Sequence, residues 1–236
     1  MIVSFEHEFI FMKVPKTAGT SVEVFLSQVA GADAIVTPVK PPEPNHQPRN
    51  YENTPANVRA ARRHALTDRA AWKRTSNAVN GNRPLYFNHM SAQLARDRIG
   101  SRRWGQFFKF CFERNPWDKV ISSYFWETRL EDVRPPFEAW VLEPGNVKSD
   151  RRLYTIDDTV VVDFVGCYEN LEADLRVALE RSGVTTSIEL PRAKGAVRRT
   201  DARVAITKRA DDVICREYGP ELEQFEYRRP PEIPWE

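Results

Sequence analysis

A loop near the start of the chain has the residue types of an anion site. Residues 11–21, FMKVPKTAGTS, end an apolar run with Lys16 and Gly19 among hydroxyl side chains. Backbone N–H groups in such a loop can point at one anion, and the dipole of a following helix and the charge of Lys16 add to the attraction. The loop is not a Walker A sequence, GxxxxGK[ST], because Lys16 precedes Gly19. The residues expected to bind a phosphate-like group are Lys16, Thr17, Ala18, Gly19, Thr20 and Ser21.

A second segment, ERNPWDKVISSY, has a related arrangement. Arg114 follows an apolar run, and its guanidinium can make a bidentate contact to a phosphate. Ser122, eight residues later, can add a hydroxyl from the first turns of a helix. Two anion sites are therefore expected.

Each segment also has a purely structural interpretation. One of the two hydroxyl residues after Gly19 can cap an ordinary helix start while Lys16 is solvated. Arg114 can pair with Glu113 or Asp118, with the serines that follow acting only as small helix residues. From these residues alone, both interpretations stay open.

Strand, loop and helix units must position these segments. The expected strand and helix segments are residues 2–14 and 21–31, then 107–116 and 117–130. A third pair lies within 160–183, and one more helix is expected over 210–227. In the third pair, we expect a turn at Gly166 and a helix end at Gly183. Strands that alternate with helices predict an α/β fold with a central parallel β-sheet flanked by helices on both faces. In such folds ligands bind at the carboxyl edge of the sheet, where both segments would lie.

Bulk properties restrict the class of protein. At 236 residues the chain fits one domain, 1–236. Its net charge of +2 argues against a dedicated nucleic-acid binder. Three cysteines without CxxC spacing indicate reduced thiols in a cytoplasmic protein. We expect a soluble protein without a signal peptide or membrane span, because the apolar runs are too short; the oligomeric state is left open.

A proline-rich and basic insertion, about residues 33–85, separates the first unit from the second. Residues 37–55 predict an exposed loop. Residues 57–74 are helix-compatible and basic, which suits either a solvated helix face or a surface that meets an anionic acceptor. We expect this insertion to shape an acceptor site.

His89 is the candidate general base among the four histidines. It follows a strand-like LYF and precedes a helix, and a histidine near its ordinary pKa is a competent base at neutral pH. Helix capping or burial is the alternative. The other histidines, His7, His46 and His64, are interpreted as structural, as are the aromatic residues Trp117, Tyr124, Trp126 and Trp140, and Lys13 is interpreted as a strand-edge charge.

Together these segments resemble the PAPS-dependent sulfotransferases, in particular their carbohydrate and heparan sulfate 2-O-sulfotransferase branch. KVPKTAGTS is similar to that family's 5′-phosphosulfate loop, and RNPWDKVISSY is similar to its 3′-phosphate motif. DFVGCYENLEADL and the tail, LP followed by a basic segment and a helix ending in EQFEY, are similar as well. The resemblance covers most of the chain outside about residues 31–85, and its motifs occur in the family's order.

The resemblance implies a P-loop NTPase-like three-layer fold and in-line transfer of a sulfuryl group from PAPS to an acceptor hydroxyl, most simply on a carbohydrate that can be anionic. PAP is then the product, and no metal is needed. It implies that Lys16 and His89 are catalytic and that Arg114 and Ser122 bind the donor. PRAKGAVRR, residues 191–199, loosely resembles the family's nucleotide-covering loop and adds Lys194, Gly195 and Arg198.

One departure and two alternatives accompany this hypothesis. Glu113 stands where the family usually has an apolar residue, although strand alternation would point it away from Arg114. A module that binds a nucleotide or an anionic glycan without turnover would suit the same two anion sites. A P-loop kinase-like phosphotransferase would share the sheet, but the sequence has neither GK[ST] nor a clear magnesium-binding acid.

Overall fold

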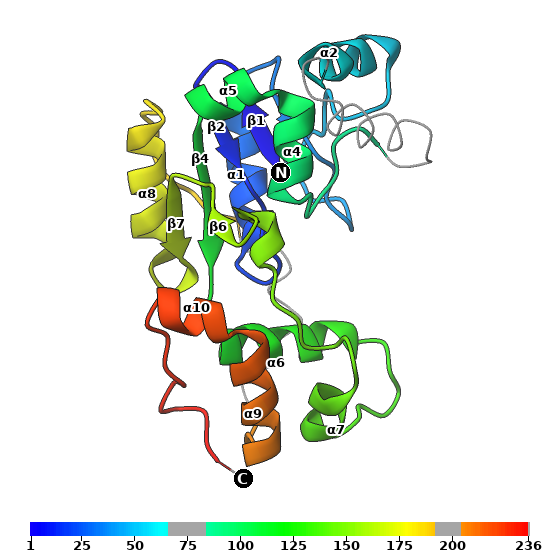
Figure 1. Ribbon diagram of the computed structural model, residues 1–236, viewed down its shortest axis with the longest axis vertical. Helices are drawn as coiled ribbons and strands as arrows, with labels where there is room; N and C mark the ends of the chain where they lie inside the picture. The colour runs from blue at the N-terminus through cyan, green and yellow to red at the C-terminus, as the bar shows by residue number, and fades with distance from the viewer. Residues whose placement is uncertain (66–83, 192–203, 236) are drawn as a thin grey trace. The chain divides into compact units, whose positions relative to one another are not determined.

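The computed structural model describes residues 1–65, 84–191 and 204–235 (Figure 1). The chain divides into two compact units. The first unit is Met1–Glu113 with Arg151–Ala193, and the second unit is Arg114–Asp150 with Lys194–Glu236. The prediction of one domain, 1–236, stays a prediction.

A mixed five-stranded sheet forms the centre of the first unit. Its strands are β1 (Ile2–Ser4), β2 (Phe9–Phe11), β3 (Ile35–Val36), β4 (Phe108–Glu113) and β7 (Phe164–Cys167), in the order β3-β1-β2-β4-β7. The β2–β4 and β4–β7 pairs are parallel, whereas β1 is antiparallel to both β2 and β3. The α/β class is therefore confirmed, and the prediction of a wholly parallel sheet is wrong at the β1–β3 edge.

The antiparallel edge arises from a turn inside the expected first strand. β1 and β2 form a hairpin in which Ile2 lies opposite Phe11 and Ser4 opposite Phe9. In the turn, the Ser4 hydroxyl accepts a hydrogen bond from the His7 backbone N–H at 3.1 Å. The polar triplet Glu6–Glu8 lies at this turn, where Glu6 and Glu8 are exposed to water.

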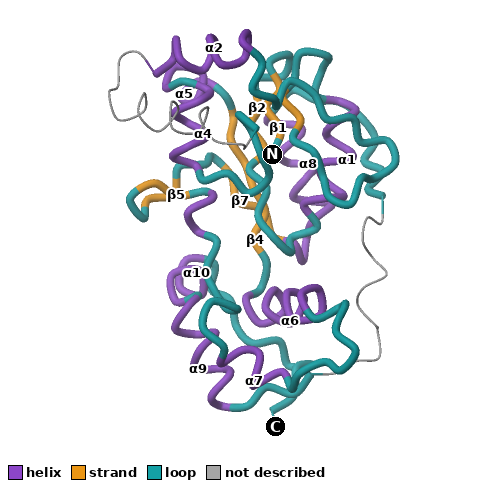
Figure 2. The backbone as a smooth tube through the Cα atoms, turned by 90° about the vertical axis from the view of Figure 1, so that its right-hand side faces the viewer, coloured by secondary structure: helices purple, strands orange, loops and turns teal. Residues whose placement is uncertain are grey.

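Helices cover both faces of the sheet. The helices of the first unit are α1 (Gly19–Val29), α2 (Pro55–Ala65), α4 (Ala92–Ile99), α5 (Ser101–Gln106) and α8 (Leu171–Arg181). Short elements complete it: the 3-10 turns Arg151–Leu153 and Tyr168–Asn170 and the hairpin of β5 (Thr155–Ile156) with β6 (Thr159–Val160). Figure 2 shows α1 and α8 on one side of the strands and α4 and α5 on the other.

The two faces follow from alternation along the strands. Phe9 and Phe11 of β2 join a core cluster with Phe25 of α1 and Leu175 of α8. Ile10, between the two phenylalanines, joins the opposite cluster, which includes α4 and α5 residues. Because successive side chains of a strand point to opposite faces, a strand covered by helices on both sides is apolar at every position.

The third strand and helix occur where expected, with one correction. Gly166 lies inside β7 and not in a turn. A Cβ atom at this position would lie 2.6 Å from the Phe112 ring and 3.0 Å from Asp174 Cβ, so the sheet and α8 approach too closely for a larger residue. Gly183, with φ of 66°, follows the end of α8 as predicted.

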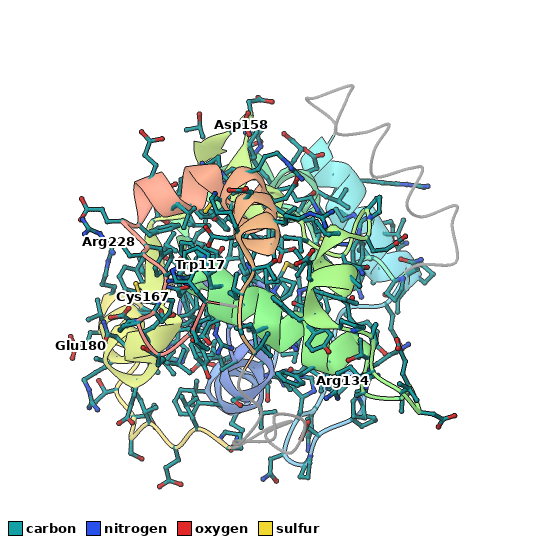
Figure 3. The ribbon with its side chains drawn as sticks, turned by 90° about the horizontal axis from the view of Figure 1, so that it is seen from below. Trp117, Arg134, Asp158, Cys167, Glu180 and Arg228 are labelled. Carbon is teal, nitrogen blue, oxygen red and sulfur yellow. The ribbon has the colours of Figure 1, made fainter. Side chains whose placement is uncertain are left out.

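The second unit is helical in its described part. Its helices are α6 (Pro116–Glu127), α7 (Phe137–Leu142), α9 (Lys208–Glu217) and α10 (Gly219–Gln224). The expected last helix is thus two helices, and Pro220 at the start of α10 cannot donate the hydrogen bond that would continue α9. Trp117 packs in the core of this unit, whereas Arg228 is exposed (Figure 3).

The segment before α2 lacks regular structure over most of its length. Residues 37–55 are mostly exposed and irregular up to the start of α2, as expected of a loop. Among the described residues, no helix is both long enough and apolar enough to cross a membrane.

Candidate functional site

The loop between β2 and α1 has the geometry of an anion-binding turn. Lys16 and Ala18 have left-handed backbones, with φ of 64° and 55°. Ala18 occupies the N-cap position of α1, and its methyl group cannot accept a hydrogen bond. The capped helix start that the sequence allowed is therefore wrong, because Thr20 and Ser21 lie inside α1. A left-handed turn that leads into an uncapped helix directs backbone N–H groups toward one point.

Lys13 lies beneath this loop. Its side chain is 6% exposed, and its ammonium group lies 2.5 Å from Glu23 Oε2 on α1. Its aliphatic part packs on Gly19, because a Cβ atom there would lie 2.8 Å from Lys13 Cγ. The interpretation of Lys13 as a strand-edge charge is wrong, because Lys13 is buried and forms an ion pair with Glu23, a buried residue of α1.

Glu23 joins the loop to more distant parts of the first unit. It is fully buried and binds the amino group of Met1 as well as Lys13. The Thr37 hydroxyl lies 3.1 Å from Glu23 Oε1 and 2.8 Å from Asn88 Oδ1. Burial alone would raise the pKa of Glu23, but the two ammonium groups outweigh it and lower that pKa.

His89 is attached to the same network through the backbone. Its Nδ1 lies 3.0 Å from the carbonyl oxygen of Lys13. A carbonyl can only accept, so Nδ1 carries the hydrogen and the neutral ring has its lone pair on Nε2. The residue has φ of 57°, and α4 begins three residues later with Ser91 as its N-cap. The expected helix is confirmed, but the LYF segment before His89 is not a strand.

His89 lines a pocket of about 600 Å³ within the first unit. The other lining residues are Phe87, Asn88, Ser91, Leu94 and Arg152. A candidate base, an aromatic ring and an exposed guanidinium thus meet in one concave region. Such a combination suits a polar ligand with a hydroxyl group.

Arg114 and Ser122 belong to the second unit. Arg114 is 5% exposed, and its Nη2 lies 3.6 Å from Asp118 Oδ2, the pairing that the sequence allowed as an alternative to anion binding. Asn115 caps α6 by accepting from the Trp117 N–H at 3.2 Å, which fixes the turn after Arg114. Ser122 is half-buried on α6.

The aromatic residues near this segment behave mostly as predicted. Trp117, Tyr124 and Trp140 belong to the core of the second unit. Trp126 is half-buried, and the Arg129 guanidinium lies 4.0 Å above its ring. Glu113 is buried at the end of β4 in the first unit.

Several predicted residues lie outside the described parts of the chain. These are Lys194, Gly195 and Arg198 of the nucleotide-covering segment, together with Arg69, Lys73 and Arg74 of the basic segment. In the described part of the basic segment, Arg59 and Arg63 are exposed on α2. Across residues 1–65, 84–191 and 204–235, no group of three His, Cys, Asp or Glu side chains could hold a metal ion.

Sequence reasoning missed Glu23, Thr37, Asn88 and Arg152. Glu23 did carry a signal, since it is a lone acid within the apolar helical segment SVEVFL. Asn88 directly precedes the candidate base His89, and this adjacency is its only signal in the sequence. Thr37 and Arg152 are far from both motifs in the sequence, so only the folded chain brings them close to His89 and Asn88.

Comparison with known proteins gives one relative. An uncharacterized protein of Archaeoglobus fulgidus is 32% identical over 110 residues, which is 43% of this chain and 88% of that protein. This chain belongs to the same family. No protein-family model matches the chain, and no solved structure matches it significantly. The relationship therefore carries no activity over to this chain.

Proposed function

We propose that this protein is a PAPS-dependent sulfotransferase that acts on a sugar hydroxyl. The observation that carries the proposal is the double role of Lys13. Its carbonyl oxygen accepts from His89 Nδ1, and its side chain packs on Gly19 of the KTAGTS loop. The candidate base and the candidate phosphate loop are thus held by one residue.

The sheet supports the donor half of the proposal. β2 and β4 are parallel neighbours, and their carboxyl ends lead into the two segments that resemble the 5′-phosphosulfate and 3′-phosphate motifs. With helices on both faces of the sheet, this arrangement suits a P-loop NTPase-like three-layer fold. In the proposal, Thr17 to Ser21 hold the 5′-phosphate, and Arg114 and Ser122 hold the 3′-phosphate.

The reaction is a displacement at sulfur. His89 Nε2 takes the proton of the acceptor hydroxyl, whose oxygen forms a bond to sulfur. The bond from sulfur to the bridging oxygen of PAPS breaks, and its electron pair stays on the 5′-phosphate of PAP. Lys16 and the backbone N–H groups of the loop stabilise the charge that grows on that oxygen. The Lys13 carbonyl keeps the imidazolium oriented after proton transfer.

The acceptor binds in the pocket that His89 lines. Arg152 is exposed at this pocket and suits a sugar that carries a carboxylate or sulfate. Phe87 and Leu94 supply apolar surface for the ring of the sugar. The base, the arginine and the apolar wall together favour an acidic carbohydrate.

Calorimetric titration with PAP in the absence of magnesium tests the donor site. Wild type should bind, and Arg114→Ala should weaken binding by about 1.5 to 3 kcal/mol, the contribution of a charge-assisted hydrogen bond. The matched control is Arg216→Ala, because this arginine is exposed on α9 and pairs with a surface acid, Glu217. If wild type does not bind PAP, the proposal is wrong.

A second experiment separates the enzyme from a binding module. His89→Ala should retain PAP affinity and lose sulfate transfer to an acidic glycan such as desulfated heparan. A module without turnover would show no transfer in either protein.

A further inference from the structure

A second pocket of the first unit is lined by a buried arginine, Arg98. The pocket has a volume of about 250 Å³ and shares no lining residue with the pocket of His89. It is lined by Phe5, Asp33, Ile35, Asn50, Asn57, Ala60, Tyr86, Arg98, Ile99 and Arg103. Arg98, near the end of α4, is only 1% exposed.

The contacts of Arg98 compensate its charge only in part. Its guanidinium carbon lies 5.6 Å from the centre of the Phe87 ring, a cation–π contact. Nη1 donates to the carbonyl oxygen of Leu85, which is neutral. Within the described chain, Nε is buried and has no hydrogen-bond acceptor. Burial lowers the pKa of Arg98 to about 10, although Tyr86 and Asp97 act in the opposite direction. A buried guanidinium with an unused donor is costly, because the interior cannot solvate it as water does.

The remaining lining defines the kind of anion. Arg103 and Asp33 are exposed, so with Arg98 the charged side chains of the lining sum to one positive charge. The Tyr86 hydroxyl is neutral at pH 7, since an ordinary tyrosine pKa is about 10 and burial raises the pKa of Tyr86 to about 12. Phe5, Ile35 and Ile99 supply apolar walls.

We propose that this pocket binds a small organic monocarboxylate, with the carboxylate on Arg98 and the apolar body against Phe5 and Ile35. One negative charge matches the net charge of the lining, and the volume suits a molecule smaller than the usual ligands of pockets of about 300 to 1,000 Å³. The proposal concerns Arg98 and does not depend on sulfate transfer.

Titration with benzoate tests the site on the complete protein. Benzamide has the same shape without the charge, and inorganic sulfate has charge without the apolar body. Wild type should bind benzoate at least about tenfold more tightly than either control. Benzamide lacks the carboxylate that makes the charge-assisted hydrogen bond, and sulfate lacks the ring that packs against the apolar walls. Equal binding of benzamide, stronger binding of sulfate, or no binding of benzoate would overturn the proposal.

Variants and a direct probe locate the binding. Arg98→Met should weaken benzoate binding at least about tenfold, and Arg102→Gln, which alters an exposed arginine outside the pocket lining, should not change it. The proton resonance of Arg98 Nε–H in wild type should move downfield as benzoate saturates the site, a readout that needs no folded Arg98 variant. An unmoved resonance at saturation would exclude Arg98 as the ligand-binding group.

Discussion

The Lys13 carbonyl oxygen and His89 Nδ1 lie 3.0 Å apart, although 76 residues separate them in the chain. This contact places the hydrogen of the neutral imidazole on Nδ1, and in the proposed mechanism Nε2 acts on a ligand in the adjoining pocket. The same residue, Lys13, reaches Glu23 through its side chain.

His89→Ala should lower kcat for sulfate transfer by roughly 10² to 10⁴-fold, the usual contribution of a general base. KM for PAPS should change little, because the donor loop is not in contact with the imidazole in the proposal. Steady-state kinetics measure both. His7→Ala, which changes a half-buried histidine in the β1–β2 turn, is the control and should retain activity. Full activity of the His89 variant would remove this residue from the mechanism.

Glu23→Gln should destabilise the protein by about 3 to 5 kcal/mol, because it leaves the Lys13 ammonium buried without its counter-charge. Urea unfolding measures the loss. Glu172→Gln is the matched control: this carboxylate lies 3.5 Å from Arg176 on the exposed face of α8, and such pairs contribute about 0 to 1 kcal/mol. Similar losses for the two variants would contradict a buried network at Glu23.

Acid should weaken the fold partly through Glu23. Its pKa is lowered in the folded state, so the unfolded state binds protons first as the pH falls below about 4.3, the ordinary glutamate value. The stabilisation is therefore present above that pH and is lost as the pH falls through the folded pKa. Between pH 5 and pH 3 the Met1 amino group, with a pKa of about 6, is mostly protonated and adds little slope.

The measurement is the free energy of unfolding from pH 5 to pH 3. Wild type should lose stability more steeply than Glu23→Gln over this range, since the glutamine does not titrate. Parallel slopes would show that Glu23 has an ordinary pKa in the folded protein.

Gly19→Ala should destabilise the fold by about 1 to 3 kcal/mol, the usual cost of overpacking. The new Cβ would lie 2.8 Å from Lys13 Cγ and 3.3 Å from the Val14 carbonyl oxygen, and the Glu23 ion pair prevents Lys13 from moving away. PAP affinity should fall as well. Thermal denaturation and calorimetry measure the two effects.

Gly105→Ala provides the comparison for Gly19→Ala. Gly105 lies in α5, and a Cβ atom there would meet nothing within 4 Å. Alanine favours helix over glycine, so this variant should be neutral or more stable by up to about 1 kcal/mol. Equal loss of stability in both variants would argue against close packing of Lys13 on the loop.

Periodicity predicted several regular elements of both units but not their connections. β4, α6 and α8 occur where the apolar patterns placed them. The sequence does not reveal the β1–β2 hairpin, because both halves of MIVSFEHEFIFM are apolar and one strand over residues 2–14 accounts for them equally well. Apolar spacing reports which face of an element is buried, and it does not report which neighbour pairs with it.

The candidate site was predictable where its residues are consecutive. The loop of Lys16 to Ser21 and the position of His89 before a helix were both read from short segments. The network of Glu23, Thr37 and Asn88 was not, because each partner comes from a different element and only one of them is charged. Arg98 has no signal in the sequence, because it stands among other charged residues of the segment ARDRI, and only its burial distinguishes it.

The acceptor for His89 Nδ1 is a main-chain atom, and every amino acid has that atom. The choice of imidazole tautomer is consequently encoded by the path of the backbone at position 13 and survives any side-chain change there that preserves this path. Substitutions of Lys13 would thus perturb charge and packing while the histidine keeps its protonation pattern. At position 13 the hydrogen bond to His89 therefore tolerates other side chains, whereas the ion pair with Glu23 requires a lysine-like cation.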